Sequence, residues 1–306
     1  MPAHVNADHD HRRSVWMMLV AVLMFALMDA GLKTLTAHYP PLQVATLRGL
    51  SSLPLVLAWA LWTTGLRPLL RIRWPLHLLR GWLGILMMGS FVYALKRLPL
   101  STAYSIFFVA PLLITALSVP ILGEKVGPRR WTAIGVGLIG VLTVLRPTGA
   151  GMFTWAGLAV LVAALAYAVS AITVRVLART DSNQAMVVWM LAMMALGAGV
   201  LAWPGWVSLR LQDAWIIAVV GITGSLGQYT ITEAFRRGEA SLIAPLEYTA
   251  LVWGVGLDLA LWGVLPKAMT WLGAAIIIAS GLYLLRRERV PRPSIPEARA
   301  CPWAGE

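Results

Sequence analysis

Long apolar segments recur along the whole chain, and they constrain its fold more than any other feature. The segments are residues 15–36, 43–62, 77–95, 101–122, 131–145, 155–178, 185–203, 215–235, 241–262 and 270–285. Most of them approach the roughly 20 residues that a helix needs to cross a bilayer. The sequence therefore predicts an all-α integral membrane protein with ten transmembrane helices. Because the segment 131–145 is short, nine helices is the alternative count.

The composition agrees with a membrane protein and indicates its orientation. The 306 residues are 59% hydrophobic and 12% charged, whereas a soluble domain carries about 25% charged residues. Most of the 25 Lys and Arg residues lie in the two tails and in the loops on one predicted side of the membrane. Since cytoplasmic loops carry such an excess, we expect a multi-pass protein of the cell inner membrane with both termini in the cytoplasm.

The net charge of +12 follows from this topology. We therefore expect the lipid bilayer, and no nucleic acid, as a partner. Most of the 15 Trp residues lie near the ends of the predicted spans, as in the aromatic belts that anchor helices at the membrane surface. Trp253 lies in the middle of a span, so we keep it as a candidate substrate-binding residue.

The polar tails, residues 1–14 and 286–306, are predicted to be disordered. The first tail contains His4, His9 and His11 next to two aspartates. This cluster is suited to weak metal binding, but a solvated tail is the preferred interpretation. The single cysteine, Cys301, excludes a disulfide or a cysteine metal site within one chain. We expect no cofactor and no resident metal.

The chain resembles itself over two halves. "GEKVGPRRW", which ends at Trp131, has the same spacing as "GVLPKAMTW", which ends at Trp271, and "KRLPLS" matches "RRGEAS" at the same separation. We predict two five-helix repeats, at residues 15–146 and 155–285. Because five is odd, the second repeat enters the membrane from the opposite side. Such inverted repeats place a substrate near the midplane, where the halves meet.

Three charged residues lie inside the first two spans: Asp29, Lys33 and Arg48. A charge at the bilayer centre costs roughly 2.5–3.5 kcal/mol, so such residues face a cavity and find partners. Asp29 and Lys33 are four residues apart on one helical face and are predicted to pair. Together with Arg48 they carry a net charge of +1, which favours a pocket for an anionic substrate. The alternative is a structural ion network between the two helices.

A second set of candidates lies in the ninth span. Glu247 and Tyr248 follow a proline, and Asp258 comes eleven residues after Glu247, about three turns further along one helical face. Because burial favours the protonated carboxyl, the two acids are predicted to relay protons. Tyr104 and Tyr248 are added as residues that could line the substrate site, although packing is the ordinary role of a mid-span aromatic residue.

The order of several motifs resembles a known family. The motifs are "ATLRGL" in the second span, "LPLSTAYSIFFVAPLL" in the fourth, "LGEKVGPRRWTAIGVGLIGVLTVLRP" entering the fifth and "ASLIAPLEYTALVWG" in the ninth. Their order and spacing resemble the drug/metabolite transporter superfamily of the EamA type, over residues 15–285. The resemblance implies a ten-helix inner-membrane secondary carrier, most often an exporter of amino acids and related metabolites and in some cases an importer of cofactors.

These observations predict a function. We expect an exporter of a small carboxylate-bearing metabolite, an amino acid or an opine-like or metallophore-like derivative, that works by alternating access and is coupled to protons. The alternatives are uptake of a cofactor-like molecule of the riboflavin or S-adenosylmethionine type, or a membrane subunit without transport. No nucleophile with its base and no nucleotide-binding motif is present, so we do not expect an enzyme. We expect a monomer or a homodimer.

Overall fold

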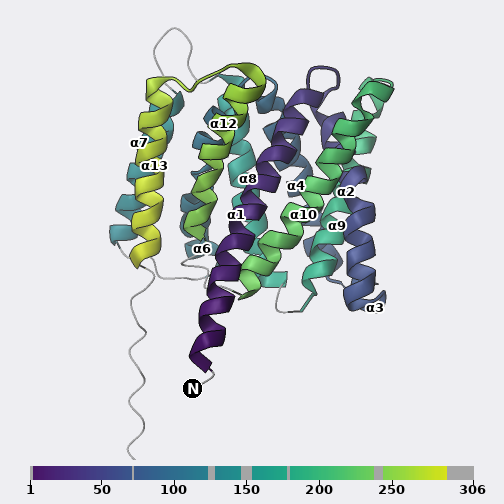
Figure 1. Cartoon of the computed structure of the whole chain (residues 1–306), viewed down its shortest axis with the longest axis horizontal. Coiled ribbons are helices and arrows are strands. Elements are labelled where there is room, and N and C mark those ends of the chain that lie inside the picture. The colour runs from purple at the N-terminus through teal and green to yellow at the C-terminus, as the bar shows by residue number, and fades with distance from the viewer. Residues whose placement is uncertain are drawn as a thin grey trace, which may run out of the picture.

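The computed structural model describes residues 3–70, 72–122, 128–145, 154–177, 180–237 and 244–287. Every regular element in these ranges is helical (Figure 1). The α-helices of the first half are α1 (Ala3–Leu35), α2 (Pro41–Thr64), α3 (Arg67–Leu70), α4 (Trp74–Leu95), α5 (Leu100–Phe107), α6 (Ala110–Leu122) and α7 (Pro128–Leu145). Those of the second half are α8 (Trp155–Leu177), α9 (Asn183–Ala202), α10 (Ala214–Arg237), α12 (Ala250–Trp262) and α13 (Ala268–Arg287).

Short 3-10 helices complete the fold: η1 (Trp203–Gly205), η2 (Leu211–Asp213) and η3 (Ala244–Thr249). Six helices (α1, α2, α4, α8, α9 and α10) contain segments long and apolar enough to cross a membrane. The other predicted spans correspond to α5 with α6, to η3 with α12, and to the shorter helices α7 and α13. The architecture is thus the predicted all-α membrane fold.

The predictions for the two tails fare differently. Helix α1 already begins at Ala3, so the chain is helical through most of the segment that was expected to be disordered. That prediction is wrong from Ala3 onward, because the first helix extends well beyond its apolar part. The side chains of His4, His9 and His11, like residues 288–306, lie outside what the structure describes.

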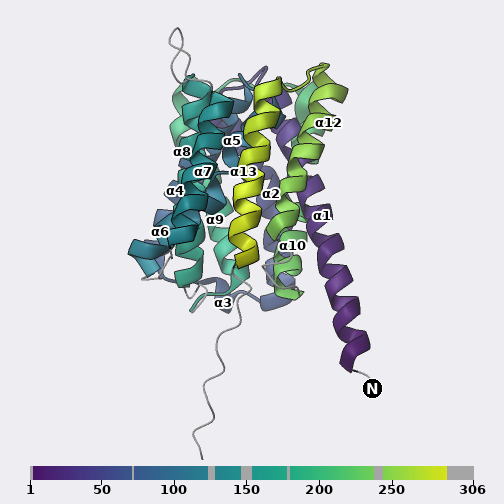
Figure 2. The same cartoon turned by 90° about the vertical axis from the view of Figure 1, so that its left-hand side faces the viewer.

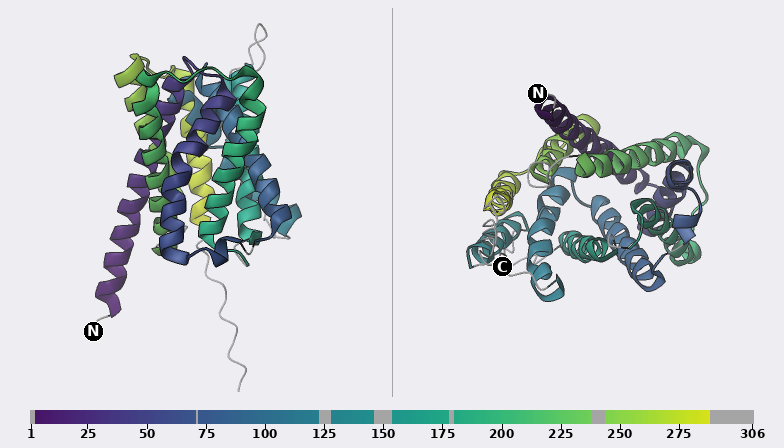
Figure 3. Two further views of the ribbon diagram at one scale, coloured as in Figure 1. Left: turned by 90° about the vertical axis from the view of Figure 1, so that its right-hand side faces the viewer. Right: turned by 90° about the horizontal axis from the view of Figure 1, so that it is seen from below.

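The helices pack in pairs that an inverted repeat relates to one another. Helix α1 packs on α10, and α4 packs on α8; α2 packs on both α9 and α10, and α4 also packs on α9. Exchanging the two predicted halves converts each of these pairs into another pair or into itself. Helices α7 and α13 form their own pair at the edge of the molecule opposite α2 and α9 (Figures 1 and 3).

Small residues allow the closest of these contacts. In α7 and α13, Gly140 and Gly273 face each other, and a Cβ added at Gly273 would lie 2.6 Å from the carbonyl oxygen of Gly140. Glycine permits this approach because it has no side chain, and close backbone approach is a main source of helix association in membranes. The two helices stand side by side in Figure 2.

The fourth predicted span is interrupted near its middle, and the ninth contains a 3-10 helix in its first half. Phe108 and Val109 form a turn between α5 and α6, and the 3-10 helix η3 precedes α12. The two interruptions meet, because the rings of Phe108 and Tyr248 lie edge to face with centroids 5.1 Å apart. Discontinuous helices of this kind form the substrate sites of many secondary transporters.

Polar clusters join the two halves at both ends of the molecule. At one end the hydroxyl of Tyr39 donates to Asp213 (2.7 Å), and the side chain of Gln43 exchanges two hydrogen bonds with the backbone of Val207. At the other end Asp181 accepts from the backbone amide of Arg73 (3.1 Å) and lies 2.8 Å from the ring nitrogen Nε2 of His77. Both clusters are present in the same structure, so the helices around them are held together at both ends.

Candidate substrate-binding site

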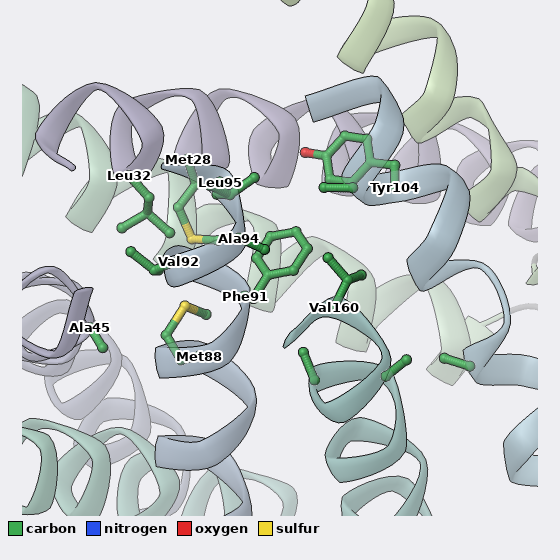
Figure 4. Packing of buried hydrophobic residues seen from close by; sticks show 14 of the residues in the cluster. Met28, Leu32, Ala45, Met88, Phe91, Val92, Ala94, Leu95, Tyr104 and Val160 are labelled. Carbon is green, nitrogen blue, oxygen red and sulfur yellow. The ribbon is translucent and has the colours of Figure 1, made fainter. Parts of the chain in front are cut away.

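Asp29 in α1 and Tyr104 in α5 form a buried hydrogen-bonded pair. The Tyr104 hydroxyl donates to Asp29 Oδ2 over 2.8 Å. The ring of Tyr104 stacks against Phe91 of α4, with centroids 6.4 Å apart, and lies against Gly254 of α12, where an added Cβ would come within 2.8 Å. Figure 4 shows Tyr104 and Phe91 beside Met28 and Met88 in the apolar core. One carboxylate therefore links α1 to the broken helix.

Lys33 pairs with Asp258 rather than with Asp29. Its Nζ lies 3.2 Å from Asp258 Oδ1 and 4.3 Å from the centre of the Trp262 ring. No ion pair within 4.0 Å joins Asp29 and Lys33 in the described part of the chain, so that prediction is wrong. The physical reason is that each side chain has a better partner on another helix: Tyr104 for Asp29, and Asp258 for Lys33.

Asp258 is fully buried and its carboxylate is saturated with donors. Besides Lys33, it accepts from the backbone amides of Leu100 (2.9 Å) and Ser101 (2.8 Å) and from the Ser101 hydroxyl (2.7 Å). It thereby satisfies the free amides at the N-terminus of α5, where a negative charge is also favoured by the helix dipole. This geometry is that of a structural anchor and does not support the predicted proton-relay role of Asp258.

The predicted ladder of Glu247 and Asp258 also assumed a continuous α-helix. Glu247 lies in the 3-10 helix η3, whereas Asp258 lies in α12, which begins at Ala250. A 3-10 helix has three residues per turn in place of 3.6, so the count of three α-helical turns does not apply.

Arg48 in α2 is buried (8% exposed) and incompletely paired. Its Nε donates to the sulfur of Met28 over 3.2 Å, and thioether sulfur is a weak acceptor. Its Nη1 has no hydrogen-bond partner in the part of the chain that the structure describes. The Asp29 carboxylate is near enough to interact electrostatically but forms no ion pair with Arg48 within 4.0 Å. Arg48 thus keeps one buried N–H donor, at Nη1, that has no acceptor among the described residues.

Glu247 and Tyr248 in η3 also lack partners. No hydrogen bond or ion pair joins the partly buried Glu247 carboxylate to any described residue, and the buried Tyr248 hydroxyl has none either. Glu247 is close enough to Tyr167 of α8 and to Tyr248 to interact with them electrostatically. Among the predicted charges, Arg48 therefore keeps an unpaired N–H group, and Glu247 has no hydrogen bond or ion pair with a described residue.

Trp253 does not join the other candidates. On α12 the buried positions are Leu251, Gly254 and Asp258, which share one face. Trp253 is 38% exposed and lies on the opposite face, beside the exposed Val252. Trp253 makes none of the contacts that join the other candidates, and its substrate role stays a prediction.

Two aromatic residues near the candidates were not predicted. Phe91 contacts Phe107 with ring centroids 5.6 Å apart, and Phe107 contacts Tyr167 at 5.4 Å. With Tyr104 these rings form a continuous series from α5 across α4 to α8. In the sequence, the one sign of a role in the site was that Phe91 and Tyr167 lie in the middle of predicted spans. Aromatic residues that only pack in the core lie there just as often.

A bundle of inverted five-helix units with interrupted spans and unneutralised charges defines a membrane transporter. The model of the EamA-like transporter family matches residues 12–146 and 154–286, so the chain belongs to this family. The family has a ten-helix membrane fold, so the predicted count of ten, not nine, is confirmed. The protein is a multi-pass membrane transporter of a small molecule.

The chain is similar to several curated relatives. It is 30% identical to "Riboflavin transporter" of Vibrio cholerae over 92% of this chain and 95% of the relative. It is 24% identical to "Pseudopaline exporter CntI" of Pseudomonas aeruginosa over 91% of this chain and 98% of the relative. It is 28% identical to "S-adenosylmethionine uptake transporter" of Rickettsia prowazekii over 73% of this chain and 76% of the relative. A solved crystal structure shares the fold, with a TM-score of 0.64 and 22% identity. The match covers 92% of this chain and 100% of the chain in that structure.

Proposed function

We propose that this transporter exports a small carboxylate-bearing metabolite across the inner membrane by alternating access, with Arg48 as the group that binds the carboxylate. The observation that carries the proposal is the buried Nη1 of Arg48, which has no acceptor among the described residues. Burying a charged donor without a partner is costly, and native proteins rarely leave such a group unsatisfied. A substrate carboxylate supplies the missing acceptor.

The neighbours of Arg48 suit a reversible site. Met28 offers only a weak sulfur acceptor, which a carboxylate displaces at little cost. Asp29 is held by Tyr104, so it lowers the local positive charge without occupying the guanidinium. Arg48 offers a planar fork of N–H donors that matches a carboxylate. Lys33 contributes through Asp258 to the support of this region rather than to the binding of substrate.

Glu247 is the proposed proton-coupling residue. Its carboxylate has no described partner that would hold it in one charge state, and it lies at the junction of the two interrupted spans. We therefore expect Glu247→Gln to prevent accumulation of substrate against its gradient while leaving exchange of substrate across the membrane largely intact.

Uptake of a cofactor-like molecule is the second candidate. The ring series of Tyr104, Phe91, Phe107 and Tyr167 favours it, because planar heteroaromatic molecules stack on such rings. The relatives named for riboflavin and for S-adenosylmethionine fit this reading. Binding of riboflavin that is lost in Phe91→Leu, yet unchanged in Arg48→Gln, would favour it over the carboxylate exporter.

The test of the first proposal uses Asp29 and Arg48 together. Asp29 and Arg48 interact electrostatically without forming an ion pair. Removing one of two opposite buried charges leaves the other uncompensated, at a cost of about 3–5 kcal/mol, whereas removing both is often neutral. Asp29→Asn with Arg48→Gln should therefore give a stable protein that no longer binds carboxylates. Arg48→Lys should also bind weakly, because it keeps the charge but loses the fork.

The measurement is binding of a panel of small carboxylates to purified, monodisperse protein in detergent, with thermal stability followed in parallel. Asp10→Asn in the first residues of the chain serves as the matched control. Near-normal carboxylate affinity in a stable double variant would overturn the proposal and make Arg48 a structural residue.

A further inference from the structure

The surroundings of Glu247 differ from those of every other acid described in the transmembrane part of the fold. Asp29 accepts from Tyr104, and Asp258 is saturated by four donors. Glu247 has no hydrogen bond or ion pair with any described residue. Two tyrosines lie near it instead: Tyr248, its neighbour in the chain, and Tyr167 of α8 are both close enough to interact electrostatically with its carboxylate.

These rings are held in place by further rings. Tyr248 meets Phe108 edge to face at 5.1 Å, and Tyr167 lies 5.4 Å from Phe107. The Tyr248 hydroxyl is buried and unpaired. The cluster comprises a single carboxylate, two phenol rings and two phenyl rings, contributed by η3, by α8 and by the turn and helix of the interrupted fourth span.

The chemistry of this set selects one class of ligand. A lone carboxylate among aromatic faces attracts an organic cation, because the rings bind it through their negative faces and the acid neutralises its charge. A divalent metal ion such as calcium takes six to eight oxygen ligands, which these side chains do not offer. An internal lysine or arginine would serve equally well, but no described one reaches Glu247.

We propose that Glu247, with Tyr167, Tyr248 and Phe108, forms a subsite for an organic cation, the alkylated ammonium or sulfonium end of the transported molecule. The inference rests on the proposed function, in which a small molecule passes between the repeats and its carboxylate binds Arg48. The substrate is then a zwitterion. The rings of Tyr104, Phe91, Phe107 and Tyr167 connect the end of the site near Asp29 and Arg48 with the end near Glu247.

This subsite also explains how a proton is coupled to transport. The carboxylate binds either the substrate cation or a proton, so each displaces the other. Proton entry at Glu247 then releases the cationic end of the substrate on one side of the membrane. No separate relay through Asp258 is needed.

The probe for the test is tetramethylammonium, which carries no carboxylate. Tetramethylammonium chloride is titrated into purified protein at constant ionic strength, with sodium chloride as the reference, and thermal stability and intrinsic fluorescence are followed. The wild type should be stabilised by tetramethylammonium beyond the sodium reference. Glu247→Gln should weaken the apparent affinity by about tenfold or more, because the opposite charge is lost. Glu247→Asp should retain part of the binding.

Ring variants keep the test independent of the folding of any one variant. Tyr167→Phe should bind tetramethylammonium nearly as well as the wild type, and Tyr167→Leu should bind several times more weakly. Equal responses to tetramethylammonium and sodium in the wild type, or an unchanged response in a folded Glu247→Gln protein, would overturn the inference.

The double variant Asp29→Asn with Arg48→Gln separates this inference from the proposed function. It should lose carboxylate binding while its response to tetramethylammonium stays intact. Carboxylate binding that depends on Arg48, together with no response to tetramethylammonium, would contradict the cation subsite and leave the proposed function standing. The reverse pattern would contradict the carboxylate site alone.

Discussion

Asp29 and Asp258 show how the same residue type acquires different roles from its partners. Asp258 accepts from two backbone amides, a hydroxyl and Lys33, so its charge stabilises three helices. Asp29 has one neutral donor and a nearby arginine that remains incompletely paired. The first arrangement is structural, and the second leaves capacity for a ligand.

The sequence identified these charges but not their partners. A buried acid or base is visible in a long apolar segment, which is why Asp29, Lys33, Arg48, Glu247 and Asp258 could be predicted as candidates. The partner of a buried charge often lies on another helix and depends on how the helices pack. Because the sequence does not show this packing, the nearest charge along the chain was predicted to be the partner. The face of α12 that turns inward is likewise decided by contacts with α1 and α5, which the sequence does not show.

The structural role of Asp258 predicts a loss of stability. Asp258→Asn should lower the free energy of unfolding by about 3–5 kcal/mol, because Lys33 is left without its partner and the cap of α5 is weakened. Adding Lys33→Met should recover part of the loss. Thermal denaturation in detergent measures both. Glu247→Gln is the control and should change stability far less, so an equally stable Asp258→Asn protein would contradict the anchor.

At the scale of elements, apolar length predicted the spans well and their interruptions poorly. The segment 101–122 is apolar throughout, yet α5 ends at Phe107 and α6 begins at Ala110. Hydropathy averages over such a turn. The local signal in the ninth span was its proline, but a proline does not distinguish a kink from the 3-10 helix that the structure contains. The interruptions matter because they bring Phe108 and Tyr248 into contact.

The polar cluster at Asp181 predicts how the stability of the fold depends on pH. Burial alone would raise the pKa of Asp181, but hydrogen bonds from Thr180, from the Arg73 amide and from His77 outweigh burial and lower the pKa below its ordinary value of 3.8. A carboxyl group with a lowered pKa contributes stability above the ordinary value, and the contribution disappears as the pH falls toward the folded value.

The wild type should therefore lose stability between about pH 5 and pH 3 in part through Asp181. Asp181→Asn should lower stability at pH 7 by about 1–3 kcal/mol, because the ring of His77 and the amide of Arg73 lose a charged acceptor. The variant should also show a shallower decline in acid. Thermal midpoints from pH 7 to pH 3.5, with Asp10→Asn as the control, measure both effects; parallel curves for Asp181→Asn and wild type would contradict this account.

At the scale of the whole molecule, the paired packing of the two halves is what the internal sequence repeats predicted. The pairs α1 with α10 and α4 with α8 exchange when the halves are exchanged, and α2 with α9 maps onto itself. The polar clusters at both ends tie these six helices together. Helix α5 packs on α8 and α12 packs on α1, whereas α7 and α13 pack on each other and on α5. We expect the movements of transport in this second group of helices.

Orientation in the membrane is a separate prediction. The distribution of Lys and Arg places both termini in the cytoplasm. A reporter fused after Arg287 should show cytoplasmic activity, and one inserted in the loop 203–212 should show periplasmic activity. Reversed signals would contradict the orientation.

The central claim is that this transporter moves a carboxylate-bearing molecule that is bound by Arg48. The most direct measurement incubates proteoliposomes with a whole-cell metabolite extract and identifies the accumulated compounds by mass spectrometry. Wild-type vesicles should accumulate one or a few carboxylates above empty vesicles, and vesicles with Asp29→Asn and Arg48→Gln should not, although the variant inserts normally. Accumulation of the same carboxylates by the double variant, or enrichment confined to molecules without a carboxylate, would contradict the claim.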